Sequence, residues 1–166
     1  MVLRSNQPPA GLPPEEIADR LEILDVLACY AHALDEKDWA VLTEVFTPDA
    51  TIDLTSSGGI RCTSEEFRVW APVALGRFTQ TQHMLGQSEF SFGPDGTAAV
   101  KTYQYNPMAW VSENGTEHLF VVGGYYRDRL VRTPGGWRVC ERSWHMQWRQ
   151  GELPDLPPAP QRAPGS

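Results

Sequence analysis

The chain has 166 residues, of which 41% are hydrophobic and 21% charged, and its formal net charge at pH 7 is −7. These values are ordinary for a globular protein and are sufficient for one domain with a buried core. The acidic balance argues against nucleic acid or an anionic membrane surface as a partner, because no Lys- and Arg-rich stripe could neutralise phosphates. No apolar run approaches the ~18 residues of a membrane span. Residues 1–14 also lack the apolar core of a signal peptide. We therefore expect a cytoplasmic protein.

The cysteines and histidines show no metal-binding pattern. Cys29, Cys62 and Cys140 are odd in number and far apart, which fits neither a disulfide framework nor a zinc site. The four histidines lack a closely spaced ligand pair. We expect reduced thiols, no bound metal and no cofactor.

The first predicted element is a long helix. Residues 1–13 are rich in Pro, Asn and Gln and are expected to be flexible, whereas a proline followed by two glutamates favours a helix start at Pro14. Apolar residues then recur at spacings of three and four as far as Leu34, in two adjacent stripes. Such a broad apolar face suits a helix that packs against a sheet.

The end of this helix carries potential proton carriers, Tyr30 and Asp35, within little more than one turn. A carboxylate in the last turn faces the negative end of the helix dipole, at a cost of about 0.3–1 kcal/mol. Burial there would also raise its pKa. Asp35 is therefore either chemically active or the cap of a second helix, with Asp38 as the partner in a capping box. His32 points elsewhere on the helix and is expected at the surface.

Two more helices and two short strands are predicted next. The second helix runs from about Lys37 to Phe46, and short strands follow at 51–55 and 60–62, joined by a turn of Ser and Gly. Thr63 with Glu66 forms a predicted capping box for the third helix. Pro72 should shorten or kink that helix.

From Gln80 onward the chain has the character of long strands separated by short turns, which makes neighbours antiparallel. Strands of roughly 12–15 residues exceed the usual length and must curl or bulge, and Gly123-Gly124 is a natural place for the bend. The predicted strands are His83–Phe92, Ala98–Val111, Glu117–Val131 and Trp137–Arg149.

Helices followed by a strongly curved antiparallel sheet predict an α+β fold with the helices on one face. A curled sheet plugged by a long helix makes a cone whose open mouth is a pocket. Residues 14–151 form this single domain, and the Pro-rich residues 152–166 are expected to be disordered.

Two stretches resemble the SnoaL-like family of the nuclear-transport-factor-2-like superfamily. They are Tyr30-Ala-His-Ala-Leu-Asp35 with the following Phe46-Thr-Pro-Asp49, and the hairpin Gly124–Arg142. The resemblance spans roughly Glu15 to Gly151 and implies a cone-shaped α+β barrel that forms a homodimer or homotrimer through the sheet face. Within the superfamily the chain looks closest to the scytalone-dehydratase and bile-acid-dehydratase group. Gln87 and Leu54 depart from the residues common in that group, which leaves the substrate open.

The resemblance implies three catalytic residues, because those enzymes use a Tyr and an Asp of the first-helix region and a His at a strand start. The matching positions are Tyr30, Asp35 and His83. A carboxylate bonded to one imidazole nitrogen leaves the other nitrogen as a base, and a Tyr hydroxyl can stabilise negative charge on a carbonyl oxygen.

This chemistry suits a cofactor-independent dehydratase acting on a hydrophobic, oxygenated small molecule such as a polyketide, steroid or terpenoid. A different leaving step gives isomerisation or cyclisation. The alternative is a non-catalytic ligand-binding or accessory subunit, in which Asp35 would cap helix two and His83 would lie beyond ~4 Å from any acidic partner.

Several strand residues are further candidates for substrate binding, although alternation lets only one parity set of a strand face inward. Asp53 lies on the first strand with its role open. Arg127, Asp128, Arg129 and Arg132 are expected to form a solvated or interface ladder of ion pairs. The substrate-binding candidates are His118, Asn106, Trp110, Tyr103 and Trp144.

Overall fold

The structure is a computed structural model, and it describes residues 11–158. Residues 1–10 and 159–166, which belong to the predicted flexible N-terminus and disordered tail, lie outside the described part. The elements in chain order are α1 (Pro14–Asp35), α2 (Leu42–Val45), β1 (Phe46–Asp53), the 3-10 helix η1 (Thr55–Ser57), β2 (Arg61–Thr63), α3 (Ser64–Leu75), β3 (Gln80–Thr81), β4 (Met84–Phe92), β5 (Thr97–Val111), β6 (Glu117–Thr133) and β7 (Gly136–Gln150).

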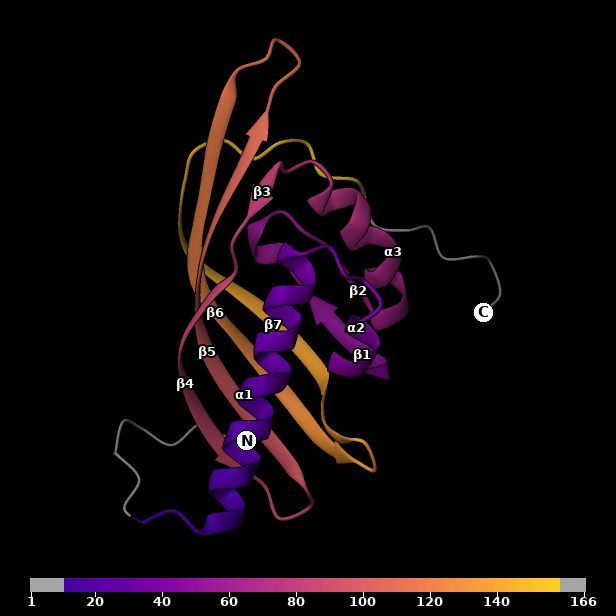
Figure 1. The fold of residues 1–166 in the computed structure, drawn as a ribbon, viewed down its shortest axis with the longest axis vertical. Coiled ribbons are helices and arrows are strands. Elements are labelled where there is room, and N and C mark those ends of the chain that lie inside the picture. The colour runs from indigo at the N-terminus through magenta and orange to yellow at the C-terminus, as the bar shows by residue number, and fades with distance from the viewer. Residues whose placement is uncertain (1–10, 159–166) are drawn as a thin grey trace.

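One strongly curved, seven-stranded sheet forms the wall of the molecule (Figure 1). The strand order is β2-β1-β7-β6-β5-β3, and β4 also pairs with β5. The long central strands β5, β6 and β7 pair antiparallel, as predicted. The pairing of β1 with β7 is parallel, so the sheet is mixed and the prediction of a purely antiparallel sheet is wrong at this edge. The predicted α+β cone is confirmed.

Helix α1 begins at Pro14, as predicted, and lies across the concave face of the sheet (Figure 1). Its inner side carries Ile23, Leu27 and Tyr30, each no more than 1% exposed. α3 covers the β1 side and starts at the predicted capping box of Thr63 and Glu66. It continues past Pro72 to Leu75, so this proline does not end the helix.

The second predicted helix is much shorter than expected. Lys37 takes a left-handed backbone with φ of 60°, which no α-helix tolerates, and only Leu42–Val45 is helical. Phe46 already belongs to β1, which continues through Pro48. The register between β1 and β7 shifts in this stretch. A proline is tolerated at such an irregularity because it has no N–H to donate to the ladder.

Two irregularities in the β6–β7 pairing shape the inside of the cone. The register shifts at Gly123-Gly124, the predicted bend, where a Cβ on Gly124 would collide with the carbonyl oxygen of His145. A second shift places Cys140 as an extra residue in β7. Because of this bulge, Val139 and Arg142 are both buried although their numbers differ in parity.

Residues 152–158 are ordered against the domain, contrary to the predicted disorder. Leu153 and Leu156 pack against the hydrophobic core, and the segment passes from the end of β7 towards α3 (Figure 1, yellow). Hydrophobic contact of these two leucines outweighs the proline-rich composition that led to the prediction.

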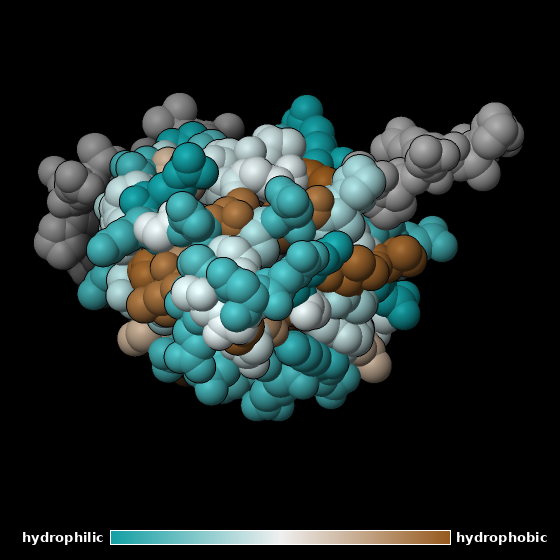
Figure 2. All heavy atoms as spheres, turned by 90° about the horizontal axis from the view of Figure 1, so that it is seen from above, coloured by the Kyte–Doolittle hydropathy of each residue, from teal (hydrophilic) through white to brown (hydrophobic). Residues whose placement is uncertain are grey.

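Seen from above, most of the surface is hydrophilic, and the hydrophobic residues emerge as separate patches (Figure 2). Within residues 11–158, no helix combines the length and hydrophobicity needed to cross a membrane.

A buried ion pair lies at the closed end of the cone. Arg142 donates through Nε and Nη2 to the two carboxylate oxygens of Asp128 at 2.7 and 2.8 Å, and both side chains are 0% exposed. The expectation of a solvated ladder is therefore wrong for Asp128, although Arg127, Arg129 and Arg132 on the same strand are exposed.

Replacing Asp128 by Asn should lower the free energy of unfolding by about 3–5 kcal/mol, because the Arg142 charge would remain buried without its partner. Urea denaturation measures this loss. The control is Glu141→Gln, which removes the carboxylate of the exposed pair Arg129–Glu141 on the same two strands and should cost at most about 1 kcal/mol. Similar small losses in both variants would contradict the expected role of the buried pair.

Candidate active site

The carboxylate of Asp35, the last residue of α1, meets the irregular stretch that joins β3 to β4. His83 Nδ1 lies 2.6 Å from Asp35 Oδ1, and the backbone N–H of His83 donates to Oδ2 at 2.7 Å. Thr81 Oγ1 donates to Oδ1 at 2.8 Å. Three groups of one short segment therefore hold this carboxylate.

These contacts decide how Asp35 and His83 share protons. Burial raises the pKa of Asp35, but hydrogen bonds and charge from His83, with a bond from Thr81, outweigh it and hold the pKa below 3.8. An ionised carboxylate can only accept, so the proton of neutral His83 lies on Nδ1 and Nε2 is left as the base.

Asp35 does not cap a second helix. Its oxygens accept from the β3–β4 segment, while the amide of Asp38 bonds to the carbonyl of Ala33. The left-handed Lys37 then turns the chain away. The separation of Asp35 and His83 is also far inside the ~4 Å limit that we set for a non-catalytic module.

Tyr30 lies one turn before Asp35, with its ring in an aromatic cluster. The ring centroids of Phe46, Tyr126 and His83 lie 5.8, 5.8 and 6.5 Å from that of Tyr30. Burial raises the pKa of Tyr30, and the positive charge of Arg142 and a hydrogen bond with Tyr126 offset this only in part. Tyr30 therefore remains protonated at neutral pH and able to donate.

Arg142 supports the two tyrosines from behind. Its guanidinium carbon lies 3.9 Å from the ring centroid of Tyr30 and 4.4 Å from that of Tyr126. Burial lowers the pKa of Arg142, but the carboxylate of Asp128 more than offsets this, so Arg142 stays protonated and its charge is balanced by that of Asp128. A fixed cation thus lies beneath the aromatic floor.

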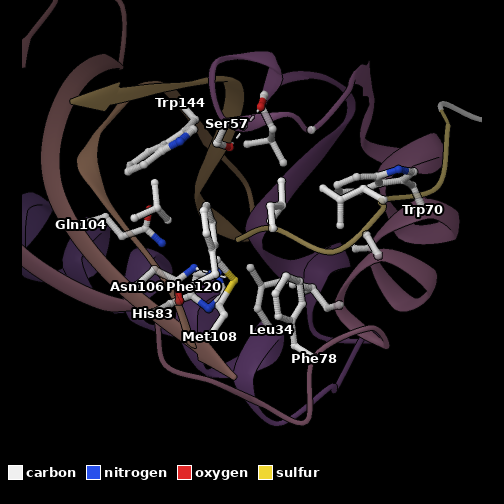
Figure 3. Close-up of a pocket in the computed structure, with 18 of the residues that line it drawn as sticks. Leu34, Ser57, Trp70, Phe78, His83, Gln104, Asn106, Met108, Phe120 and Trp144 are labelled. Atoms are coloured by element: carbon white, nitrogen blue, oxygen red, sulfur yellow. Dashed lines mark hydrogen bonds between the residues drawn. The ribbon is translucent and has the colours of Figure 1, made fainter. Parts of the chain in front are cut away.

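A cavity of about 90 Å³ lies above this floor, between α1, α3 and the concave sheet. Figure 3 shows that His83, Gln104 and Asn106 gather on one side of it, while Phe78 and Trp70 lie on the other. Asn106 Oδ1 is buried with no hydrogen-bond partner among residues 11–158. The other lining side chains are mainly apolar, so a few polar groups face a hydrophobic pocket.

The structure brings together the three predicted catalytic residues and two of the predicted substrate contacts. Tyr30, His83, Asn106 and Trp144 line the cavity, and Asp35 stands directly behind His83.

The remaining substrate-binding candidates do not line the cavity. Trp110 and His118 stack at 4.2 Å between ring centroids beyond the lining residues, and Tyr103 is half-exposed on the outer sheet face. His32 is exposed, as expected. Asp53 bonds to Thr55 at the start of η1 and has no part in the cavity.

Thr81, Tyr126 and Arg142 are residues of the site that were not predicted from the sequence. Thr81 lies two residues before His83, but nothing local marks it as a partner of Asp35. Arg142 is hidden from an alternation argument because the bulge at Cys140 changes the parity of β7. Tyr126 alternates regularly with exposed neighbours in β6, but the pattern does not show that it faces the cavity.

A search of residues 11–158 finds no cluster of three or more His, Cys, Asp or Glu side chains that could hold a metal ion. The polar groups of the cavity lining include instead an imidazole, two amides, two phenols and the hydroxyl of Ser57.

A sequence profile described as the SnoaL-like domain matches residues 15–143. The chain belongs to the SnoaL-like family. A relative of this chain is an uncharacterised protein of Mycobacterium tuberculosis strain H37Rv. The two are 40% identical over 128 residues, which are 76% of this chain and 84% of that protein.

Solved structures share the fold. A candidate aromatic ring hydroxylase from Novosphingobium aromaticivorans has a TM-score of 0.74 at 26% identity and covers 86% of this chain and 97% of its own. A candidate scytalone dehydratase from the same species has a TM-score of 0.73 at 17% identity, covering 89% and 97%. A nuclear transport factor 2-like superfamily protein from Salmonella enterica has a TM-score of 0.67 at 14% identity, covering 79% and 92%.

The Asp35 contacts predict a pH-dependent stability. Since the pKa of Asp35 in the folded protein lies below its ordinary value of 3.8, its contribution is complete above that value and is lost as the pH falls through the folded pKa. The free energy of unfolding of Asp35→Asn should therefore fall less than that of the wild type between pH 6 and pH 3, with urea denaturation as the measurement. Asp95→Asn, in an exposed turn, is the control, and parallel pH profiles for wild type and Asp35→Asn would contradict this expectation.

Proposed function

We propose that this protein is a cofactor-independent lyase of the dehydratase type, in the scytalone-dehydratase and bile-acid-dehydratase group. Its substrate would be a hydrophobic, oxygenated small molecule of the polyketide, steroid or terpenoid kind. The observation that carries the proposal is the contact of Asp35 with His83 Nδ1 at 2.6 Å beside an apolar cavity. The dehydratase named among the solved structures supports the fold alone, so the chemistry rests on this geometry.

The proposed reaction begins with a carbon acid next to a carbonyl group. His83 Nε2 takes the proton from the α carbon while Asp35 stabilises the imidazolium that forms. Tyr30 donates a hydrogen bond to the carbonyl oxygen as it becomes an enolate. The β carbon–oxygen bond then breaks, the hydroxyl leaves with the imidazolium proton as water, and a carbon–carbon double bond remains.

Asn106 has a place in this scheme because its unpaired Oδ1 lies in the cavity. An unsatisfied buried acceptor costs free energy until a donor reaches it. The departing or retained hydroxyl of a substrate is such a donor, so Asn106 would orient that end of the molecule, with Trp144 against its apolar part.

The same base supports two other outcomes. Return of the proton to a different carbon gives isomerisation, and attack of the enolate on a second carbonyl gives cyclisation. A non-catalytic ligand-binding or accessory subunit is the remaining alternative, and the close Asp35–His83 contact argues against it.

The test is a panel of β-hydroxy ketones incubated with the protein in deuterated water and analysed by mass spectrometry. Dehydration removes the mass of one water, whereas isomerisation loses no water and raises the mass by about 1 Da for each deuterium taken up. We expect His83→Gln to lower the rate by about 10²–10⁴-fold and Tyr30→Phe to lower it by about 10²–10³-fold.

The matched controls are His145→Gln and Tyr103→Phe, because both residues lie on the sheet outside the cavity. Unchanged turnover in His83→Gln and Tyr30→Phe would remove the mechanism. Tight binding of a panel member with neither water loss nor deuterium uptake would favour the non-catalytic alternative.

We also propose that the outer sheet face mediates self-association into a dimer or trimer. Tyr105 and Trp148 from β5 and β7 are 44% and 47% exposed, with ring centroids 5.9 Å apart, and Tyr103 and Leu119 lie exposed on neighbouring positions. Exposed aromatic groups of this kind are typical of interfaces.

Trp148→Glu should shift the protein towards monomer in sedimentation velocity, because a charge would be buried in the interface. Val69→Glu on α3, where Val69 is 62% exposed, is the control and should leave the oligomeric state unchanged. A monomeric wild-type protein would contradict the proposal.

A further inference from the structure

The segment Gly151–Pro158, here named the closing segment, crosses one side of the cavity. It leaves β7 through Gly151, whose φ of 85° suits glycine and where a Cβ would collide with the carbonyl oxygen of Leu119. The chain is thereby turned from the end of the sheet towards α3 (Figure 1).

Two tryptophan side chains hold the closing segment from opposite sides. Trp110 Nε1, from β5, donates to the carbonyl oxygen of Glu152 at 2.8 Å. Trp70 Nε1, from α3, donates to the carbonyl oxygen of Pro157 at 2.9 Å. Both bonds reach backbone carbonyls, so they hold the path of the chain whatever its side chains are.

Between these two anchors, the closing segment contributes side chains to the cavity wall. Leu153 and Leu156 are cavity-lining residues, and both pack against the hydrophobic core. Leu153 also lies over η1, where its Cδ2 is 3.3 Å from the position of a Cβ on Gly58. The two leucines thus belong to the apolar part of the cavity lining.

The prolines of the closing segment lower the conformational entropy that is lost when the segment becomes ordered. Pro154, Pro157 and Pro158 restrict the backbone of the free chain, so less conformational entropy is lost when the segment settles on the domain. The segment has no helix or strand of its own, so displacing it breaks only the two indole bonds and the leucine contacts.

The small volume of the cavity makes the position of this wall important for the size of ligand that can bind. The cavity volume of about 90 Å³ is smaller than the roughly 300–1,000 Å³ of sites that hold drug-sized ligands. A substrate with several rings needs more room than this volume provides, and displacing part of the wall would supply it. The closing segment follows residues 15–143, the range of the family profile, and is held to the domain by the two indole hydrogen bonds.

We propose that the closing segment is a displaceable wall of the ligand site, with Leu153 and Leu156 as specificity-determining residues that set the largest ligand accepted. The proposal rests on the cavity being the ligand site of the proposed function, and it does not depend on which reaction occurs there.

The first test compares a small and a larger phenolic probe, phenol and 2-naphthol, by isothermal titration calorimetry on the full chain. Leu153→Ala/Leu156→Ala should lower the Kd of 2-naphthol about tenfold while that of phenol changes little, because only the larger ring needs the removed volume. The control is Leu21→Ala, an exposed position on α1. Equal changes for both probes, no change, or no binding of either probe to wild type and double variant would overturn the proposal.

A second variant tests the displacement itself without shortening a side chain of the wall. Trp70→Phe/Trp110→Phe removes both indole N–H groups but keeps aromatic rings in place, and Trp148→Phe on the outer face is the matched control. We expect association of 2-naphthol, followed by its fluorescence in stopped flow, to be several-fold faster in the double variant than in wild type and control. An unchanged association rate would show that the segment does not gate access.

These experiments distinguish a failure of the proposal for the closing segment from a failure of the lyase proposal. Retained size selection with no His83-dependent turnover would count against the lyase proposal alone. Normal turnover with unaltered size selection in both double variants would count against the closing segment alone.

Discussion

The hydrogen bonds between the Asp35 carboxylate and the segment that contains Thr81 and His83 are the interaction on which the rest of the candidate site depends. An acidic side chain at the C-terminal end of a helix opposes the helix dipole, and burial adds a further cost. Asp35 is tolerated there because Thr81 and His83 supply it with three hydrogen-bond donors. The same bonds tie the end of α1 to the edge of the sheet, so the position of the helix and the orientation of the imidazole are set together.

A buried ion pair lies behind the rings of Tyr30 and Tyr126. Arg142 and Asp128 come from neighbouring strands and are fully buried, which is costly unless both charges are paired. The guanidinium faces the rings of Tyr30 and Tyr126 and not the cavity. Because Asp128 balances the charge of Arg142, the pair gives the two rings rigid support from below and adds no net positive charge there.

Many features of the fold and of the candidate site could be predicted from the sequence, because local residue patterns agree with the order of the elements along the chain. The stripes of α1, the capping box at Thr63 and the bend at Gly123-Gly124 are local signals. The meeting of Tyr30, Asp35 and His83 was expected from the family resemblance. Three features were not predictable, each for a physical reason. The left-handed Lys37, which prevents helix two from starting at that residue, has no marker in its residue type, and the extra residue Cys140 reverses the alternation that would otherwise direct Arg142 outward. The order of residues 152–158 depends on indoles of Trp70 and Trp110, far away in sequence.

The position of Leu153 and Leu156 after the last strand has a genetic consequence. Since β7 ends at Gln150, mutations in the codons for residues 151–158 would alter these leucines while leaving every helix and strand of the described domain intact. Diverging lineages could thus exchange one side of the pocket through changes confined to this short segment. Such changes would widen or narrow the range of molecules admitted while the imidazole and its carboxylate stay as they are.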